Sequence, residues 1–243
     1  VNVNVISLDE SQYNPGITML DYESLDFSVA LDSYGNPVWF ADKTVFDNSR
    51  IIVTQFLPTG NIVGFGPGTG YEFDLDSDII FETPEGLGVH HHIHKTSNDT
   101  YFFIDAEVQS NLCPIECNQD LPNVIPWQGD AFVEVNNQGN IIWEWSTFDY
   151  LSLNEYNPLW IENYSGFGNF DWTHSNSVFL DEENSIVYVS IRNLSRITAI
   201  DYLSKNILWN IGKADFMDEI YFENDYGFSH QHSAQISDDN NLL

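Results

Sequence analysis

The feature that most constrains the fold is a unit of two short strands that recurs four times along the chain. Each copy alternates apolar and polar residues, turns at Gly, Asn or Asp, and continues into an apolar stretch that ends in an aromatic residue. The copies span residues 27–39, 71–81, 131–143 and 197–209. Alternation with a period of two and turn residues at a similar offset predict antiparallel β-hairpins. The chain is therefore predicted to be all-β.

A second type of hairpin lies between these copies, for example over residues 51–65, 89–104 and 171–192. Two hairpins per unit make four strands, which is one blade of a β-propeller. The shortest spacing between closing aromatics, from Trp39 to Phe81, is also the length of one blade. We predict an irregular lead-in over residues 1–25 and a partial propeller over residues 26–243, with about four blades and the start of another. A closed ring hides its strand edges, so we expect the remaining blades to lie beyond Leu243.

The composition limits the partners. Seven Lys and Arg stand against 37 Asp and Glu, which gives a net charge of −30. Such a charge repels nucleic acid and anionic lipid, so we expect neither as a partner. No run of 18 apolar residues is present, and no helix is expected to span a membrane. A saline setting screens this self-repulsion, and we expect a periplasmic or secreted protein. The sequence is compatible with both a monomer and a homodimer.

The two cysteines, Cys113 and Cys117, are too few for a four-cysteine zinc site. In an exported protein this spacing predicts a small-loop disulfide, with two free thiols as the alternative. The acidic segment 74–78 resembles part of a calcium loop, but it lacks the glycine and the distant glutamate of that motif. We therefore predict no metal there.

The histidines are concentrated in equivalent places. In a propeller the first strand of each blade lines the central channel, and here those strands carry five of the seven histidines. These five are His90, His91, His92, His174 and His232. Arg192, one of the few basic residues, comes from the return strand of the hairpin over residues 171–192, and we expect His174 in the middle of the first strand of that hairpin. The remaining two, His94 and His230, are interpreted as structural.

A pocket of histidine and arginine in an acidic protein suits a tetrahedral oxyanion such as sulfate. Arginine offers forked donors of fixed geometry, and histidine offers further N–H groups. A histidine that binds no metal can also act as a nucleophile or as a general acid and base. The sequence contains no nucleophile elbow, no Gly-rich phosphate loop and no HExxH motif.

At these residues the chain resembles the PAPS-independent arylsulfotransferases (arylsulfate sulfotransferases), which are exported six-bladed propellers. The resemblance rests on D-W-x-H-x-N-S at residues 171–177, S-x-R-x-x-S at 190–195 and Q-H-x-A at 231–234. These motifs form a specific set in a fixed order. The resemblance is strong over residues 171–243, fair over 71–145 and weak before residue 70.

The resemblance implies a role for each matched residue. His232 attacks sulfur and carries the sulfuryl group as a sulfohistidine, and His174 assists proton transfer at the phenolic oxygen. Arg192 and His91 hold the sulfuryl oxygens. The remaining substrate contacts are expected from His90, Asn176 and Trp172. The implied reaction is ping-pong, from an aryl sulfate to a phenolic acceptor, with no cofactor and no metal.

The chain departs from the family pattern at His92, where the family usually carries the aspartate of a His-His-Asp sequence. This leaves open whether His90 or His91 is the site histidine, and it removes a helper carboxylate. The cysteine pair also lies away from the place expected for the family's disulfide. Two alternatives remain: a quinoprotein-like propeller with calcium, and a non-catalytic propeller whose histidines hold a transition metal.

Overall fold

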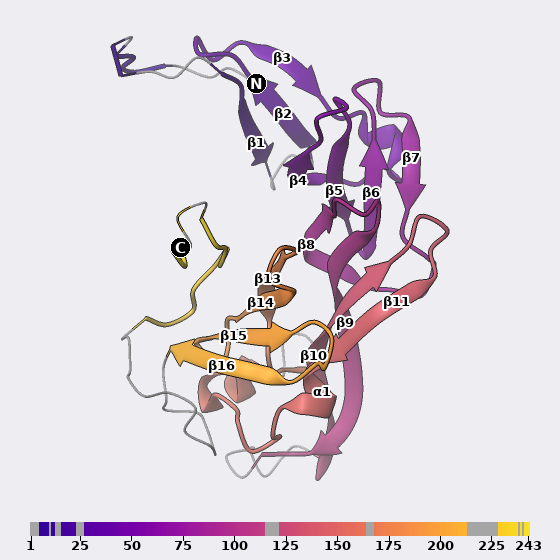
Figure 1. Cartoon of the computed structure of the whole chain (residues 1–243), viewed down its shortest axis with the longest axis vertical. Coiled ribbons are helices and arrows are strands. Elements are labelled where there is room, and N and C mark those ends of the chain that lie inside the picture. Colours follow the sequence, from indigo (N-terminus) through magenta and orange to yellow (C-terminus); the bar gives the residue numbers. More distant parts are fainter. Residues whose placement is uncertain are drawn as a thin grey trace.

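The structure is a computed structural model of the 243-residue chain. It describes residues 5–9, 11–12, 16–22, 27–114, 122–163, 168–212, 228–237, 239 and 241–243. Four antiparallel sheets follow one another along the sequence and are arranged in an arc (Figure 1). The C-terminal segment lies on the concave side of this arc (Figure 1).

The first two sheets are built from consecutive strands. The first contains β1 (Thr18–Tyr22), β2 (Phe27–Leu31) and β3 (Pro37–Phe40), and it is followed by the short helix η2 (Lys43–Val45). The second contains β4 (Ile52–Phe56), β5 (Ile62–Gly66), β6 (Thr69–Phe73) and β7 (Ile79–Glu82). The strand β1 lies inside the region predicted to be an irregular lead-in. That prediction is wrong for residues 18–22, because their backbone pairs with β2.

The third and fourth sheets are longer. The third contains β8 (Val89–Lys95), β9 (Tyr101–Leu112), β10 (Val124–Val135) and β11 (Ile141–Ser146), and the short β12 (Phe170–Asp171) pairs in parallel with β10. The helices α1 (Thr147–Tyr150) and η3 (Pro158–Asn163) lie between β11 and β12. The fourth sheet contains β13 (Ser175–Asp181), β14 (Ile186–Ile191), β15 (Arg196–Asp201) and β16 (Ile207–Gly212).

This arrangement confirms the all-β, partial-propeller prediction. Three successive sheets contain a four-stranded antiparallel meander, which is the blade unit of a propeller. The four predicted copies correspond to the hairpins β2–β3, β6–β7, β10–β11 and β15–β16. The intervening hairpins are β4–β5, β8–β9 and β13–β14.

Three of the closing aromatics join one sheet to the next. Phe81 stacks on Tyr101 of the third sheet, with 3.7 Å between ring centroids. Trp143 stacks on Tyr202, which follows β15, and its Nε1 donates to the Tyr202 carbonyl at 2.7 Å. Trp39 contacts Phe73 of the second sheet at 6.4 Å. The recurrence of these residues therefore reflects a repeated contact between neighbouring blades.

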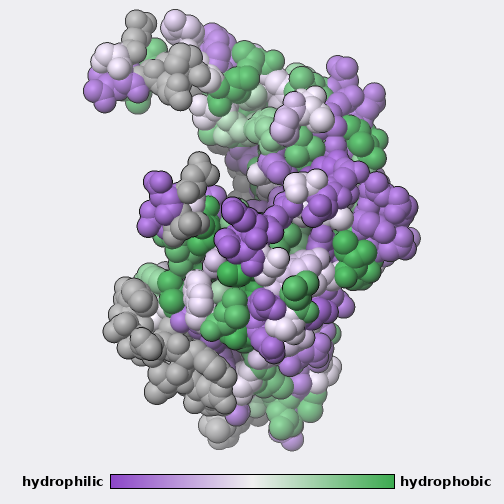
Figure 2. All heavy atoms as spheres, viewed as in Figure 1, coloured by the Kyte–Doolittle hydropathy of each residue, from purple (hydrophilic) through white to green (hydrophobic). Residues whose placement is uncertain are grey.

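The largest hydrophobic cluster fills the space between the third and fourth sheets. It includes Trp127, Trp145 and Trp172, all of them buried. The molecule is hollowed on the side where the first sheet faces the C-terminal segment (Figure 2). No helix in the described part of the chain is long and apolar enough to cross a membrane. Cys113 is disulfide-bonded, while its predicted partner Cys117 lies outside the described residues.

Candidate active site

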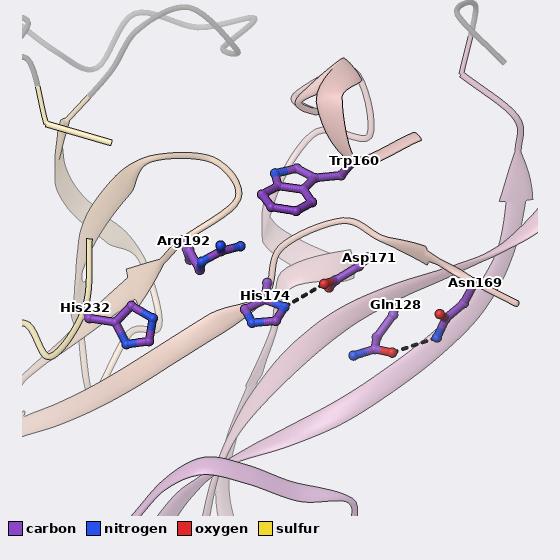
Figure 3. Close-up of a pocket in the computed structure, with 7 residues that line it drawn as sticks. All are labelled: Gln128, Trp160, Asn169, Asp171, His174, Arg192 and His232. Carbon is purple, nitrogen blue, oxygen red and sulfur yellow. Dashed lines mark hydrogen bonds and ion pairs between the residues drawn. The ribbon is translucent and has the colours of Figure 1, made fainter. Parts of the chain in front are cut away.

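A cavity of about 570 Å³ opens at the junction of the third sheet, the fourth sheet and the C-terminal segment (Figure 3). Seven residues line it: Gln128, Trp160, Asn169, Asp171, His174, Arg192 and His232. Three of them, His174, Arg192 and His232, were predicted catalytic residues. These three residues come from separate segments of the chain. They meet because the third sheet, the fourth sheet and the C-terminal segment all border the cavity.

The sequence predicts His174 in the middle of a strand. In the structure it lies immediately before β13. Its backbone is left-handed, with φ of 46°, and the strand has a register shift between Ser175 and Ser177. The imidazole Nδ1 lies 2.5 Å from Asp171 Oδ2, so the turn from β12 to β13 places an acid beside the base (Figure 3). A carboxylate on one ring nitrogen fixes the orientation of the ring and leaves the other nitrogen for a substrate.

Arg192 lies in the turn between β14 and β15. Its Nη1 donates to Asn193 Oδ1 at 2.8 Å, and the guanidinium lies 4.7 Å from the ring centroid of Trp160. Asn193 in turn donates to the Asp171 carbonyl at 2.7 Å, which ties this turn to the end of β12. The guanidinium is thus held on two sides, and its fork has further N–H groups for an anion in the cavity.

His232 is exposed, but the chain on both sides of it is anchored. Asn176 donates to the Gln231 carbonyl at 2.6 Å, and the Gln231 amide donates to Ser190 Oγ at 3.0 Å. The Ala234 N–H donates to Ser177 Oγ at 2.9 Å. Partial burial, followed by the charges of Arg192 and His174, lowers the pKa of His232. The imidazole is therefore neutral at neutral pH and carries the lone pair that a nucleophile needs.

His91 lies next to His174 but does not line the cavity. It occupies a bulge in β8, where the register shifts between His90 and Ile93, and its φ is 57°. The His91 ring centroid lies 4.9 Å from that of His174 and 6.4 Å from that of His232. Burial, then the neighbouring His90 and His174, lowers the pKa of His91 to about 4.

The other predicted substrate-binding residues have different surroundings. Trp172 is wholly buried, and its Nε1 donates to the Glu155 carbonyl at 2.6 Å. The prediction of a substrate contact at Trp172 is therefore wrong, because this side chain packs in the core with Trp127. Asn176 is 4% exposed and holds the Gln231 backbone. His90 points to Asp130 and lines a separate cavity of about 230 Å³ with Arg50.

Sequence reasoning missed four of the seven lining residues, Gln128, Trp160, Asn169 and Asp171, and also Asp130 close to them. Asp171 was visible in the D-W-x-H motif, three residues before His174. Asp130 carried a weaker signal, a single acidic residue at the start of an apolar stretch of β10. Trp160 carried none, because its contact with Arg192 depends on how the segment between β11 and β12 folds back. Among the described residues, no group of three or more His, Cys, Asp or Glu is placed to hold a metal ion.

Comparisons with solved structures place the fold. A protein of unknown function from Bacteroides caccae superposes with a TM-score of 0.51 at 9% identity, over 89% of this chain and 60% of that one. The chain thus spans about 60% of the length of that relative. The Myceliophteria thermophila Cps50 (Swd1) beta-propeller domain superposes with a TM-score of 0.43 at 11% identity, over 93% of this chain and 65% of that one.

Sequence comparisons are more specific. No curated protein matches the chain. A family model described as Arylsulfotransferase (ASST) matches residues 2–242, which is nearly the whole sequence.

Proposed function

The chain belongs to the arylsulfotransferase (ASST) family, and from this premise we propose that it moves a sulfuryl group from a phenolic sulfate ester to a phenolic acceptor through His232. The observation that carries the proposal is the convergence of His174, Arg192 and His232 on one cavity. A nucleophile, a proton carrier and an anion-binding cation are the groups that this transfer needs.

In the first half-reaction, a lone pair on the His232 imidazole attacks the sulfur of the aryl sulfate. The nitrogen–sulfur bond forms while the bond between sulfur and the aryl oxygen breaks, and the bonding electrons pass to that oxygen. His174, oriented by Asp171, gives the leaving oxygen a proton. The products are a free phenol and a sulfohistidine: an N–S bond has replaced the S–O bond, and one proton has passed from His174 to the phenol.

In the second half-reaction, a phenolic acceptor enters the same cavity. Its proton passes to His174, which was left deprotonated by the first step, and its oxygen attacks sulfur. The nitrogen–sulfur bond breaks, and its electrons return to His232. The enzyme is then restored, so the cycle consumes no cofactor and follows ping-pong order.

Arg192 supplies the electrostatic part of the mechanism. Negative charge is spread over the sulfuryl oxygens in the transition state, and a preplaced cationic donor stabilises that charge. The contacts of Arg192 with Asn193 and Trp160 hold the guanidinium before the substrate arrives. Loss of one such donor typically costs about 2.7–4 kcal/mol of barrier.

We also propose that the protein works in an oxidising compartment, the periplasm or the extracellular space. The disulfide at Cys113 supports this placement, since disulfides persist in such compartments and are rare in the cytosol. Aryl sulfates and phenols are small molecules, and a cavity of about 570 Å³ can accept a single aromatic ring with its sulfate group.

The test is intact mass spectrometry after brief exposure of the protein to 4-nitrophenyl sulfate, followed by peptide mapping at neutral pH. We expect the mass to rise by one sulfuryl group on the peptide that contains His232, and phenol to remove it. His232→Asn should abolish the adduct and lower turnover by about 10⁴-fold or more, since a covalent nucleophile has no substitute.

His230→Asn is the matched control. His230 lies on the same segment, has φ of 53° and contacts the Trp160 ring at 5.6 Å, so the exchange is chemically identical but displaced by two residues. An adduct that survives in His232→Asn, or is lost only in His230→Asn, would contradict the proposed nucleophile. Absence of both adduct and nitrophenol in folded wild-type protein would contradict the proposed reaction.

A further inference from the structure

The cavity has two chemically different ends. His232 and Arg192 lie at one end, and His174 lies between the two ends (Figure 3). An amide pair, Gln128 and Asn169, lies at the other end (Figure 3). Asn169 Nδ2 donates to Gln128 Oε1 at 2.6 Å. The proposed reaction takes place at the first end, and it assigns no role to the amide pair.

The backbone beneath the amide pair is fixed. It belongs to β10 and to the approach to β12, two strands that pair in parallel. The Trp172 N–H donates to the Gln128 carbonyl at 2.9 Å. Trp127 and Phe170, which neighbour the two amide residues in the sequence, are buried and pack edge to face with 4.7 Å between ring centroids. The amide pair is therefore held in place before a ligand arrives, and a contact with it costs little ordering of side chains.

The amide pair leaves one polar atom of Gln128 for a ligand. A primary amide carries one acceptor oxygen and one donor nitrogen, and the bond to Asn169 uses the oxygen. Among the described residues the Gln128 Nε2 atom has no hydrogen-bond partner, and Figure 3 shows it directed towards His174. If both amides were turned over, the Gln128 oxygen would take that place. A hydroxyl group suits both arrangements, because it can donate and accept.

The charges of the cavity favour a neutral group at this end. Arg192 is the arginine among the seven lining residues, and it lies away from Gln128 (Figure 3). The Asp171 carboxylate lies between His174 and the amide pair (Figure 3). A carboxylate or a second sulfate on the ring would be repelled by Asp171, in a chain whose net charge is −30. A hydroxyl group is polar without this cost.

We propose that Gln128 is a specificity-determining residue that hydrogen-bonds a second hydroxyl on the aromatic ring, with Asn169 as its positioning residue. The preferred substrates are then dihydroxybenzenes and their monosulfates, with the second hydroxyl on the side of the ring away from the sulfated oxygen. The orientation of the ring rests on the proposed function, because Arg192 and His232 receive the sulfuryl group. The cavity of about 570 Å³ has room for such a ring.

The first test measures binding in the His232→Asn variant, which lacks the proposed nucleophile. The ligands are 4-hydroxyphenyl sulfate and 4-methylphenyl sulfate, which are similar in size and differ in the group that Gln128 would contact. Isothermal titration calorimetry gives the ratio of their dissociation constants. Adding Gln128→Met should reduce the preference for the hydroxyl ligand by about 3–10-fold, which is the contribution of one hydrogen bond. Comparing this ratio between proteins cancels the difference in hydrophobicity between the ligands.

Gln109→Met is the matched control. Gln109 lies on an exposed part of β9, donates to Glu107 Oε1 at 2.7 Å and does not line the cavity, so its loss should leave the preference unchanged. Asn169→Ala removes the anchor of Gln128 and should reduce the preference by about 2–3-fold; it serves as the second variant if Gln128→Met does not fold. An equal preference in Gln128→Met and Gln109→Met, or failure of both aryl sulfates to bind, would overturn the proposal. An unchanged preference in Asn169→Ala would overturn its positioning role.

The second test separates this proposal from the proposed function. In a ping-pong reaction kcat/KM for the acceptor reports the second half-reaction, so 1,4-dihydroxybenzene and 4-methylphenol are compared with 4-nitrophenyl sulfate as the donor. Gln128→Met should reduce the preference for the dihydroxybenzene by about 3–10-fold relative to wild type. A sulfohistidine that forms and passes to both phenols with the wild-type preference would contradict the role of Gln128 alone. Absence of a sulfohistidine in wild type would contradict the proposed function, and the binding ratios would still decide the role of Gln128.

Discussion

The strand β8 and the segment that leads into β13 both carry histidines, but they use them differently. The ring centroids of His92 and His94 on β8 lie 5.5 Å apart. His94 Nδ1 has no hydrogen-bond partner among the described residues. Burial lowers the pKa of His92 to about 4 and that of His94 to about 3. His174, by contrast, has a carboxylate 2.5 Å away. The histidine run on β8 therefore does not line the cavity, whereas His174, with Asp171 beside it, does.

The largest loss of activity is expected when the acidic partner of His174 is removed. Asp171→Asn should lower kcat for aryl sulfate transfer by about 10²-fold, because an amide can donate to Nδ1 and stabilise the wrong tautomer. Steady-state kinetics with 4-nitrophenyl sulfate measure this. Asp181→Asn removes a carboxylate from the far end of β13, where it caps a turn through Asn184, and should leave kcat within a few fold. Equal activity of the two variants would show that Asp171 does not orient the base.

The half-buried pair of His92 and His94 on β8 should affect stability rather than activity. His94 stays neutral in the folded protein while the unfolded chain takes up a proton near pH 6.5, so stability falls as pH drops from about 6.5 towards 3. The slope is at most about 1.4 kcal/mol per pH unit for this group. His94→Phe preserves the stacking on Phe102 and should flatten the slope. Urea denaturation at pH 7 and pH 5 measures it, and parallel profiles of variant and wild type would contradict the prediction.

The smallest expected effect concerns the aromatic support of Arg192. Trp160→Phe keeps an aromatic ring beside the guanidinium but weakens a cation–π contact worth about 0.5–1 kcal/mol. We expect the KM for aryl sulfate to rise about 2–5-fold, with kcat within about twofold. Trp209→Phe, in β16 away from the cavity, is the control. A larger fall in kcat than rise in KM would indicate that Trp160 contacts the reacting group directly.

Much of the fold could be predicted because its signals are local. The alternation of residues 131–143 and their turn determine the hairpin β10–β11 without reference to the rest of the chain. The strand β1 was missed because residues 18–22 show no clear alternation, and their pairing with β2 supplies the order. Tertiary pairing can thus create a strand where local pattern gives no signal.

The candidate site was only partly predictable for the same reason. His174, Arg192 and His232 could be identified from motifs, and the structure brings them to one cavity. The burial of Trp172 depends on Trp127 of β10, which is distant in the sequence, and nothing in the motif distinguishes a core tryptophan from a substrate-binding one. The pairing of Asp130 with His90 likewise joins β10 to β8, two strands that are not neighbours in their sheet.

The left-handed backbone at His91 and His174 has an evolutionary consequence. Besides glycine, asparagine and aspartate share with histidine the ability to occupy this conformation at little cost. The codons of asparagine and histidine differ at one base, so a single nucleotide change can remove an imidazole and leave the chain path intact. A lineage built on this plan can therefore lose its chemistry while it keeps its shape, and propellers without activity are expected among its descendants.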